Sequence, residues 1–203
     1  MPEQPEFLDL VPVTEQHPRS GEGAMVVLRD GRLLFAYTSF EQARDDARAS
    51  IVTRCSEDAG RTWTAPQTLI ANEGAQNVMS VSLLRLQSGR LLLFYLRKES
   101  PRRCSAWVRR SDDEAHTWSE AACCTHDPVY YVIVNDCALQ LREGRIILPF
   151  EACEEVWVAD EHIVAGTVYS DDQGHTWRQS NTIYSPQRGA MEPKVVELAD
   201  GRL

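Results

Sequence analysis

The sequence of 203 residues lacks the features that mark several common classes of protein. No apolar run approaches the ~18 residues that a membrane-spanning helix needs, so we expect no membrane partner. The N-terminus has neither the basic stretch nor the apolar stretch of a secretory signal. Basic residues number 21 against 30 acidic ones, and the net charge of −9 argues against the clustered basic face of a nucleic-acid-binding protein.

Cysteine is also scarce. The six cysteines are too few for a disulfide scaffold, and they contain neither a C-x-x-C pair nor the spacing of metal ligands. We therefore expect free thiols, no metal and no cofactor. Free thiols and the missing signal together predict a cytoplasmic location.

What the sequence does contain is a repeat with a period of about 57 residues. A turn of the type Asp-Gly-Arg-Leu recurs with its glycine at Gly31, Gly89, Gly144 and Gly201, at intervals of 58, 55 and 57 residues. A second motif, Ser-x-Asp-x-Gly-x-Thr-Trp, occupies residues 56–63, 111–118 and 170–177. Two independent motifs with one period indicate a repeated structural unit.

Each period predicts four short antiparallel strands. The first strand should cover residues 24–28, 81–86, 138–141 and 195–198, and the second residues 33–37, 91–96 and 146–150. Both are apolar at nearly every position, so we expect them to be buried on both faces. A third strand leads into the Ser-x-Asp motif, and a fourth follows its tryptophan. Repeated four-stranded sheets are typical of an all-β fold, the β-propeller.

The Ser-x-Asp motif is expected to shape a turn rather than to act on a ligand. Its aspartate can accept hydrogen bonds from backbone N–H groups, and its glycine permits a left-handed backbone. Its tryptophan can pack between sheets. The second motif has Ala115 at the glycine position, so we expect a distorted or strained turn there.

These motifs resemble the Asp-box, or BNR, repeat of the sialidase superfamily, and the resemblance covers about residues 17–203. It implies a six-bladed β-propeller, of which this chain supplies about three and a half blades. The blades are expected at residues 17–72, 73–128 and 129–186, with the start of a fourth at 187–203. We expect such a partial ring to associate through exposed sheet faces, and to be inactive because half of its pocket is missing.

Polar residues recur at the start of the first strands, where a propeller blade faces its central pocket. The register nine residues before each hairpin glycine is polar throughout, and so is the register twelve before it in the first two blades. We predict a shared carbohydrate pocket from these positions, from Asp136 and from the end of a second strand. Its substrate-binding residues are Arg19, Glu22, Asn77, Ser80, Arg97, Asn135 and Asp136, with Glu192 at the same register.

The resemblance also implies catalytic roles. Glu192 would accept the proton of a tyrosine nucleophile that lies beyond residue 203, since a neutral tyrosine is a weak nucleophile without a base. Asp45 or Asp46, in the polar loop of the first blade, would be the acid/base. Arg19 lies near the place of the first substrate-binding arginine, but the Arg-Ile-Pro tripeptide of the family is missing. Sialic acid is therefore one of several possible sugars.

The leading hypothesis is an exo-acting glycoside hydrolase that removes a terminal sugar with retention and whose partner is a glycan or glycoconjugate. Two alternatives stay open. One is a propeller without catalytic activity that binds carbohydrate or a protein, because a fold does not determine a function. The other is a hydrolase for a different sugar. Tyr130 and Tyr131 could place rings under a sugar, or they could only pack between blades.

Overall fold

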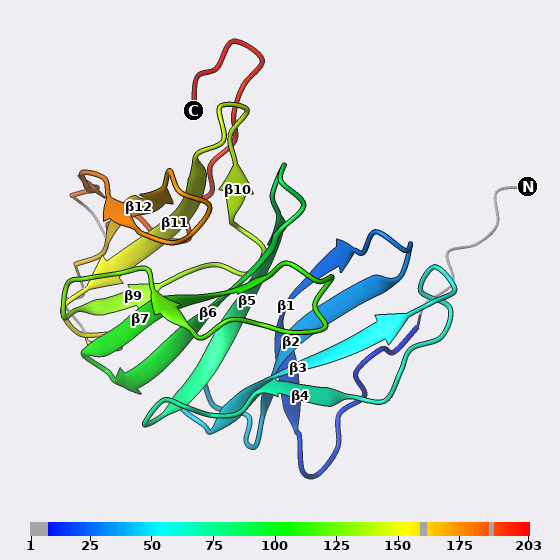
Figure 1. The fold of residues 1–203 in the computed structure, drawn as a ribbon. Coiled ribbons are helices and arrows are strands. Elements are labelled where there is room, and N and C mark those ends of the chain that lie inside the picture. Colours follow the sequence, from blue (N-terminus) through cyan, green and yellow to red (C-terminus); the bar gives the residue numbers. More distant parts are fainter. Residues whose placement is uncertain (1–7, 159–161, 187–188) are drawn as a thin grey trace, which may run out of the picture.

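The computed structural model describes residues 8–158, 162–186 and 189–203. Every regular element of this part of the chain is a β-strand, and none of its residues form a helix that could cross a membrane. Figure 1 shows groups of antiparallel strands that follow one another in chain order. The repeat therefore gives an all-β chain of successive blades, which confirms the predicted fold class.

The first blade is a separate sheet whose four strands pair in the order of the sequence. It consists of β1 (Arg19–Val27), β2 (Leu33–Phe40), β3 (Ala49–Ser56) and β4 (Gln67–Ile70). The hairpin between β1 and β2 closes with the Leu28 N–H donating to the Arg32 carbonyl at 2.8 Å. Gly31 takes a φ of 89° in this turn, a conformation that glycine adopts without steric cost.

The second and third blades share one sheet of ten strands. The second blade contains β5 (Asn77–Arg85), β6 (Leu91–Ser100), β7 (Arg103–Ser111) and β8 (Ala122–Cys123). The third contains β9 (Tyr130–Val132), β10 (Leu139–Gln140), β11 (Ile146–Cys153), β12 (Val164–Ser170), β13 (Arg178–Gln179) and β14 (Ile183–Tyr184). One parallel pairing, between Cys104 and Tyr130, connects the two blades. Both β9 and β10 pair with β11, so the inner edge of the third blade is divided between two short strands.

Apolar side chains form two clusters, one between each pair of neighbouring blades. The cluster between the first two blades includes Ile51 and Leu93, both fully buried. In the cluster between the second and third blades, the Trp177 ring packs edge-on against Phe94 with 5.5 Å between ring centroids. Burial of one such side chain stabilises the fold by roughly 1.5–3 kcal/mol, so these clusters supply the main force that joins the blades. As predicted, β5, β6 and β11 are buried over most of their length.

Two predictions about the first strands are wrong. β1 is not buried on both faces, because Met25 and Val27 are 45% and 58% exposed and no part of the described chain covers them. Residues 195–198 form no strand, although the following turn closes with the Leu198 N–H donating to the Arg202 carbonyl at 2.8 Å. A strand needs a hydrogen-bonded neighbour, and no strand of the described residues pairs with this segment.

The three Ser-x-Asp motifs fold into the same hydrogen-bonded turn. In the first motif, the Gly60 N–H donates to Ser56 Oγ at 2.8 Å, while the Thr62 N–H and hydroxyl donate to the two Asp58 carboxylate oxygens at 2.8 and 2.7 Å. The corresponding bonds of the other two motifs measure 2.6–2.9 Å. The aspartate therefore holds the turn closed, as its sequence pattern predicted.

Ala115 keeps these bonds but takes a strained backbone conformation. Its N–H donates to Ser111 Oγ at 2.9 Å, as the glycine does in the other motifs. Its φ is 67°, in the left-handed region, which costs an L-residue about 1–2 kcal/mol. The expected strain is present, but the turn is not distorted.

Neighbouring blades are also linked by a hydrogen bond that repeats with the period. The backbone N–H two residues before the hairpin glycine donates to a side chain that belongs to the next blade. The donor–acceptor pairs are Arg29 N to Glu114 Oε2 at 2.7 Å, Gln87 N to Gln140 Oε1 at 2.7 Å and Arg142 N to Glu197 Oε2 at 3.0 Å. The sequence pattern did not predict this contact. Two of the acceptors, Gln140 and Glu197, lie four positions before a hairpin glycine, whereas Glu114 belongs to the second Ser-x-Asp motif.

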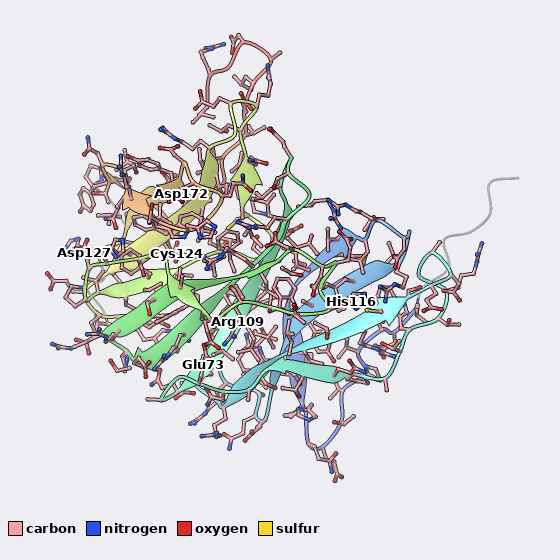
Figure 2. All side chains as sticks on the ribbon, in the orientation of Figure 1. Glu73, Arg109, His116, Cys124, Asp127 and Asp172 are labelled. Carbon is pink, nitrogen blue, oxygen red and sulfur yellow. The ribbon has the colours of Figure 1, made fainter. Side chains whose placement is uncertain are left out.

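The segment between the first two blades is fixed by an ion pair. Glu73 lies 3.2 Å from the Arg109 guanidinium of β7 and accepts a hydrogen bond from the buried Tyr95 hydroxyl. Figure 2 shows Glu73 and Arg109 side by side. Burial and this carboxylate raise the pKa of Tyr95, so its hydroxyl stays protonated.

We expect Gly60→Ala to lower the free energy of unfolding by about 1 kcal/mol, because an alanine is strained at a φ of 90°. A methyl group on the Gly60 Cα would meet Leu33 at 3.5 Å, an ordinary contact, so strain alone is tested. The matched variant Ala115→Gly should change stability less, because relief of strain is offset by loss of a methyl group packed in the first cluster. Urea unfolding of both variants checks this, and a neutral Gly60→Ala would contradict it.

Acid should weaken the Ser-x-Asp turns. Hydrogen bonds from Thr62 hold the pKa of Asp58 at about 2, below the 3.8 of a free aspartate. Thr117 does the same for Asp113, whose pKa is also about 2. A pKa lowered by folding stabilises the fold above about pH 4, and this contribution is lost as the pH falls to about 2.

Asp58→Asn should therefore melt at a lower temperature than wild type at pH 7, and the gap should narrow between pH 4 and pH 2. Thermal unfolding followed by circular dichroism across this range measures the gap. Glu57→Gln, at the exposed neighbouring position, serves as the control. A gap that is constant with pH would rule out the carboxylate as its origin.

Candidate functional site

A cavity of about 410 Å³ lies where the three blades meet, at the ends of β1, β5, β6, β9 and β11. Its charged and amide side chains come from all three blades and from the segment after them. They are Glu22, Asp45, Lys98, Asn135, Glu151 and Glu192. Ser80 and the rings of Tyr130 and Trp157 complete its polar and aromatic lining. The cavity thus gathers five residues of the predicted site.

The shared register of these residues has a backbone cause. Glu22 and Ser80 have φ values of 54° and 58°, and at each of them the pairing of the inner strand shifts by one residue. Such a β-bulge turns a side chain out of the regular alternation of the strand. Glu192 has a φ of 48° at the same register, while in the third blade Asp136, one residue later, takes a φ of 50°. Left-handed residues of this kind cluster at functional sites.

Glu22 is the one acidic residue of β1, and it lines the cavity. Its Oε2 accepts hydrogen bonds from the Ser80 N–H at 3.3 Å and hydroxyl at 3.4 Å, and its Oε1 lies 3.5 Å from the Arg19 guanidinium. Burial raises the pKa of Glu22, and Arg19 opposes this only in part. Its carboxyl group therefore takes up a proton more readily than an exposed glutamate.

Arg19 does not line the cavity but stands beside it. Its guanidinium forms ion pairs with Glu22 and Asp45 and lies 4.3 Å from the centroid of the Phe40 ring. An arginine between two carboxylates is held in place and has part of its charge neutralised. Its position fits the orientation of acidic residues better than the direct capture of an anionic sugar.

The two aspartates of the first-blade loop have different surroundings. Asp45 lines the cavity, and its carboxylate is paired with Arg19. Asp46 does not line the cavity, and its carboxylate lies 3.2 Å from the Arg44 guanidinium. The sequence left the choice between them open, and the geometry favours Asp45.

Besides Arg19, three predicted substrate-binding residues lie outside the cavity. Asn77 is fully buried and donates from Nδ2 to the backbone carbonyls of Asp45 at 2.7 Å and Ala47 at 2.8 Å. Arg97 lies on the opposite face of β6 from the cavity, where it pairs with Glu99 at 2.6 Å and covers the Trp107 ring. Asp136 is exposed, although its neighbour Asn135 lines the cavity. For Arg97 the reason is the alternation of side chains along a strand, which turns the next residue inward.

That next residue is Lys98, which was not among the predicted site residues. Lys98 is 2% exposed, and its Nζ donates to the Asp45 carbonyl at 3.1 Å. The ammonium lies 5.7 Å from the Tyr130 ring centroid and 5.3 Å from that of Trp157, within the range of cation–π attraction. Burial lowers the pKa of Lys98. The alternation of β6 was the available signal, because Arg97 and Lys98 cannot both face inward.

The far side of the cavity contains two glutamates. The Glu192 backbone N–H donates to the Glu151 carboxylate of β11, and the Glu192 side chain is exposed toward the cavity. Glu151 was also missed, because it sits within an apolar strand. Tyr130 lines the cavity, whereas Tyr131 points away from it and donates to Gln179 at 2.9 Å. In the described part of the chain no group of three or more His, Cys, Asp or Glu residues could hold a metal ion.

The fold and the site define a class of protein: a β-propeller chain whose blades carry Ser-x-Asp turns and converge on an acidic cavity. The chain belongs to the family of BNR repeat-like domains, whose pattern matches residues 7–120 and 31–203.

Two sialidases are similar in sequence. That of Micromonospora viridifaciens is 29% identical over 208 residues, which cover 89% of this chain and 31% of the relative. That of Paraclostridium sordellii is 24% identical over 206 residues, with 89% and 50% covered. The chain thus spans a third to a half of the length of these relatives.

Solved structures share the fold at low identity. The Hadza microbial sialidase Hz136 superimposes with a TM-score of 0.68 at 19% identity, over 83% of this chain and 38% of that one. A protein of unknown function from Dyadobacter fermentans gives 0.71 at 16% identity, over 86% and 57%. The intramolecular trans-sialidase of the leech gives 0.64 at 12% identity, over 83% and 44%. The chain therefore has the sialidase type of β-propeller fold.

Replacement of Glu22 by glutamine should stabilise the chain at neutral pH by about 0.5–1 kcal/mol, because an acid buried at a functional site is placed there at the expense of stability. A pKa raised by folding destabilises the fold above that pKa, and the effect fades as the pH falls and the group becomes protonated. The gain of Glu22→Gln should thus be larger at pH 7 than at pH 4. Thermal unfolding at both values, with the exposed Glu120→Gln as control, measures it. An equal or smaller gain at pH 7 would contradict this prediction.

Proposed function

We propose that these blades form part of the active site of a sialidase-like exo-glycoside hydrolase, which releases a terminal sugar from a glycan or glycoconjugate. One observation carries the proposal: Glu22, Asp45 and Glu192 converge on one cavity from three separate segments of a sialidase-type propeller. Carboxylates that share a pocket at different degrees of burial are suited to transfer protons at a glycosidic bond.

In this proposal Asp45 is the acid/base. It protonates the oxygen of the departing group and later deprotonates the attacking water. Its carboxylate is at the cavity, is half exposed and is paired with Arg19, so it can exchange protons with solvent and substrate. Asp46 lacks a position at the cavity and is the weaker candidate.

Glu192 has the complementary role at the other side of the cavity. It accepts the proton of a tyrosine nucleophile contributed from outside these residues, and the sugar is released with retention of configuration. Its left-handed backbone and the bond from its N–H to Glu151 support the role, because both restrict where its side chain can lie. The names of the relatives suggest sialic acid as the sugar.

A hydrolase for a different sugar is the second candidate. It is favoured by Arg19, whose guanidinium is engaged with two carboxylates instead of being free for the carboxylate of a sugar. The cavity lining also contains four carboxylates and a single ammonium group. This lining is better suited to bind hydroxyl groups than an anion.

The test is hydrolysis of a fluorogenic aryl sialoside by the longest form of the protein that contains these residues. Glu192→Gln and Asp45→Asn should each reduce kcat by about 10²-fold or more, the usual scale for loss of a proton-transfer group. Asp46→Asn is the competing assignment and should retain most activity. Asp45→Asn should lose still more on a glycan, whose alcohol leaving group needs protonation more than the aryl group does.

The other possible results of this assay distinguish the alternative functions. Wild-type activity toward another terminal sugar in a glycan panel, with no activity on sialosides, would support the second candidate. Glycan binding without turnover would indicate a propeller that only binds carbohydrate. Activity that survives in Glu192→Gln would overturn the catalytic role of that residue.

A further inference from the structure

Lys98 occupies the point at which the three blades meet. It belongs to β6 of the second blade, and its ammonium contacts the backbone of Asp45 in the first blade. The Tyr130 and Trp157 rings that flank it belong to the third blade. With 2% of its surface exposed, it is a buried cation that lines the cavity.

The same backbone carbonyl has a second buried donor. Asn77 Nδ2 lies 2.7 Å from the Asp45 carbonyl and 2.8 Å from that of Ala47. Asn77 and Lys98 occupy paired positions on β5 and β6. Two neighbouring strands of the second blade thus clamp the loop of the first blade on which Asp45 lies.

Lys98 has a role beyond the packing of its side chain. Burial of an ammonium group is costly, and no carboxylate within the described residues forms an ion pair with Lys98. An apolar side chain would satisfy the packing at lower cost. What the lysine adds is a donor for the loop and a positive charge near acidic groups.

The charged and titratable groups around Lys98 come from several elements. Glu22 faces it from β1, Asp45 and Asp46 from the clamped loop, and Cys104 from β7. Glu151 and Glu192 line the same cavity from the third blade and the segment after it. The charge of Lys98 lowers the pKa of Glu22, against the effect of burial.

We propose that Asn77 and Lys98 are positioning residues: from the second blade they fix the loop that carries Asp45, and Lys98 also places a positive charge beside the carboxylates of the cavity. Neither needs to touch the substrate. The catalytic meaning of this clamp rests on the role proposed above for Asp45, whereas the clamp itself does not.

The clamp is tested on the 203-residue chain by trypsin. Arg44 and Arg48 are exposed in the clamped loop, and Arg109 in β7 is a reference site that becomes accessible when the blade unfolds. Lys98→Met and Asn77→Ser should raise cleavage after Arg44 and Arg48, relative to Arg109, by about ten-fold, as expected when a hydrogen bond that holds a loop is lost. Arg97→Met, which removes the adjacent cation on the other face of β6, should leave the ratio unchanged.

The ratio of cleavage after Arg44 and Arg48 to cleavage after Arg109 separates local opening of the loop from global unfolding. The variant Lys98→Arg provides a second check. Arginine retains a donor and the charge, so it should restore a large part of the protection. An unchanged ratio in both Lys98→Met and Asn77→Ser would overturn the clamp. A ratio raised equally in Arg97→Met would show that loss of any cation from β6 has the same effect, and would also overturn it.

The electrostatic part is tested by the pH dependence of kcat in the active protein. Removal of a positive charge raises the pKa of nearby carboxyl groups, so Lys98→Met should shift the acidic limb of the profile to higher pH and lower kcat more than it changes KM. Asn77→Ser should lower kcat without shifting the limb. A limb unmoved in Lys98→Met would overturn the electrostatic role. Absence of hydrolysis in wild type would overturn the proposed function and the catalytic meaning of the clamp, while the trypsin result would still decide whether the clamp exists.

Discussion

The cavity lies where three blades meet, and the blades are joined there by apolar clusters and by hydrogen bonds between blades. Apolar clusters hold the sheets together, but apolar contact is not directional. The backbone N–H groups of Arg29, Gln87 and Arg142 each bind one side-chain oxygen of the next blade, and these bonds fix one geometry. The bulged inner strands of the first two blades bring Glu22 and Ser80 to the cavity. Residues far apart in sequence, such as Glu22 and Glu192, reach one cavity as a result.

Much of the fold could be predicted because it is encoded locally. The two motifs have short-range physical causes: a glycine where φ is positive, and an aspartate that closes its own turn, as Asp58 does. Burial of β6 follows from its unbroken apolar run. Predictions about burial and strand pairing, which depend on a neighbouring segment, were less accurate. The exposure of Met25 depends on what packs against β1, and the missing strand at 195–198 depends on a partner strand. Neither property is contained in the segment itself.

The site was predictable to the extent that it follows the register of the repeat. Glu22, Ser80, Asn135 and Glu192 were chosen by register, and all four line the cavity. Residues chosen for their chemistry alone were less well placed. Arg97 was chosen as a cation at the end of a strand, but the pleat of β6 presents Lys98 instead. Asn77 shares a register with Arg19, yet it is the side chain that holds a loop. The contacts of Asn77 with the backbone of the first blade, unlike the turns, leave no local pattern in the sequence.

The charge of the cavity limits what these blades can contribute to catalysis. Glu22, Asp45, Glu151 and Glu192 surround one ammonium group, and the arginine nearest to them is already paired with two of the carboxylates. A carboxylate of a sugar would be repelled by this lining unless other cations held it. Hydroxyl groups, in contrast, can donate to the carboxylates and accept from Lys98. In the proposed hydrolase this part of the ring would therefore bind the hydroxyl face of the sugar and move protons. Recognition of an acidic sugar would require positive charge from beyond these three blades.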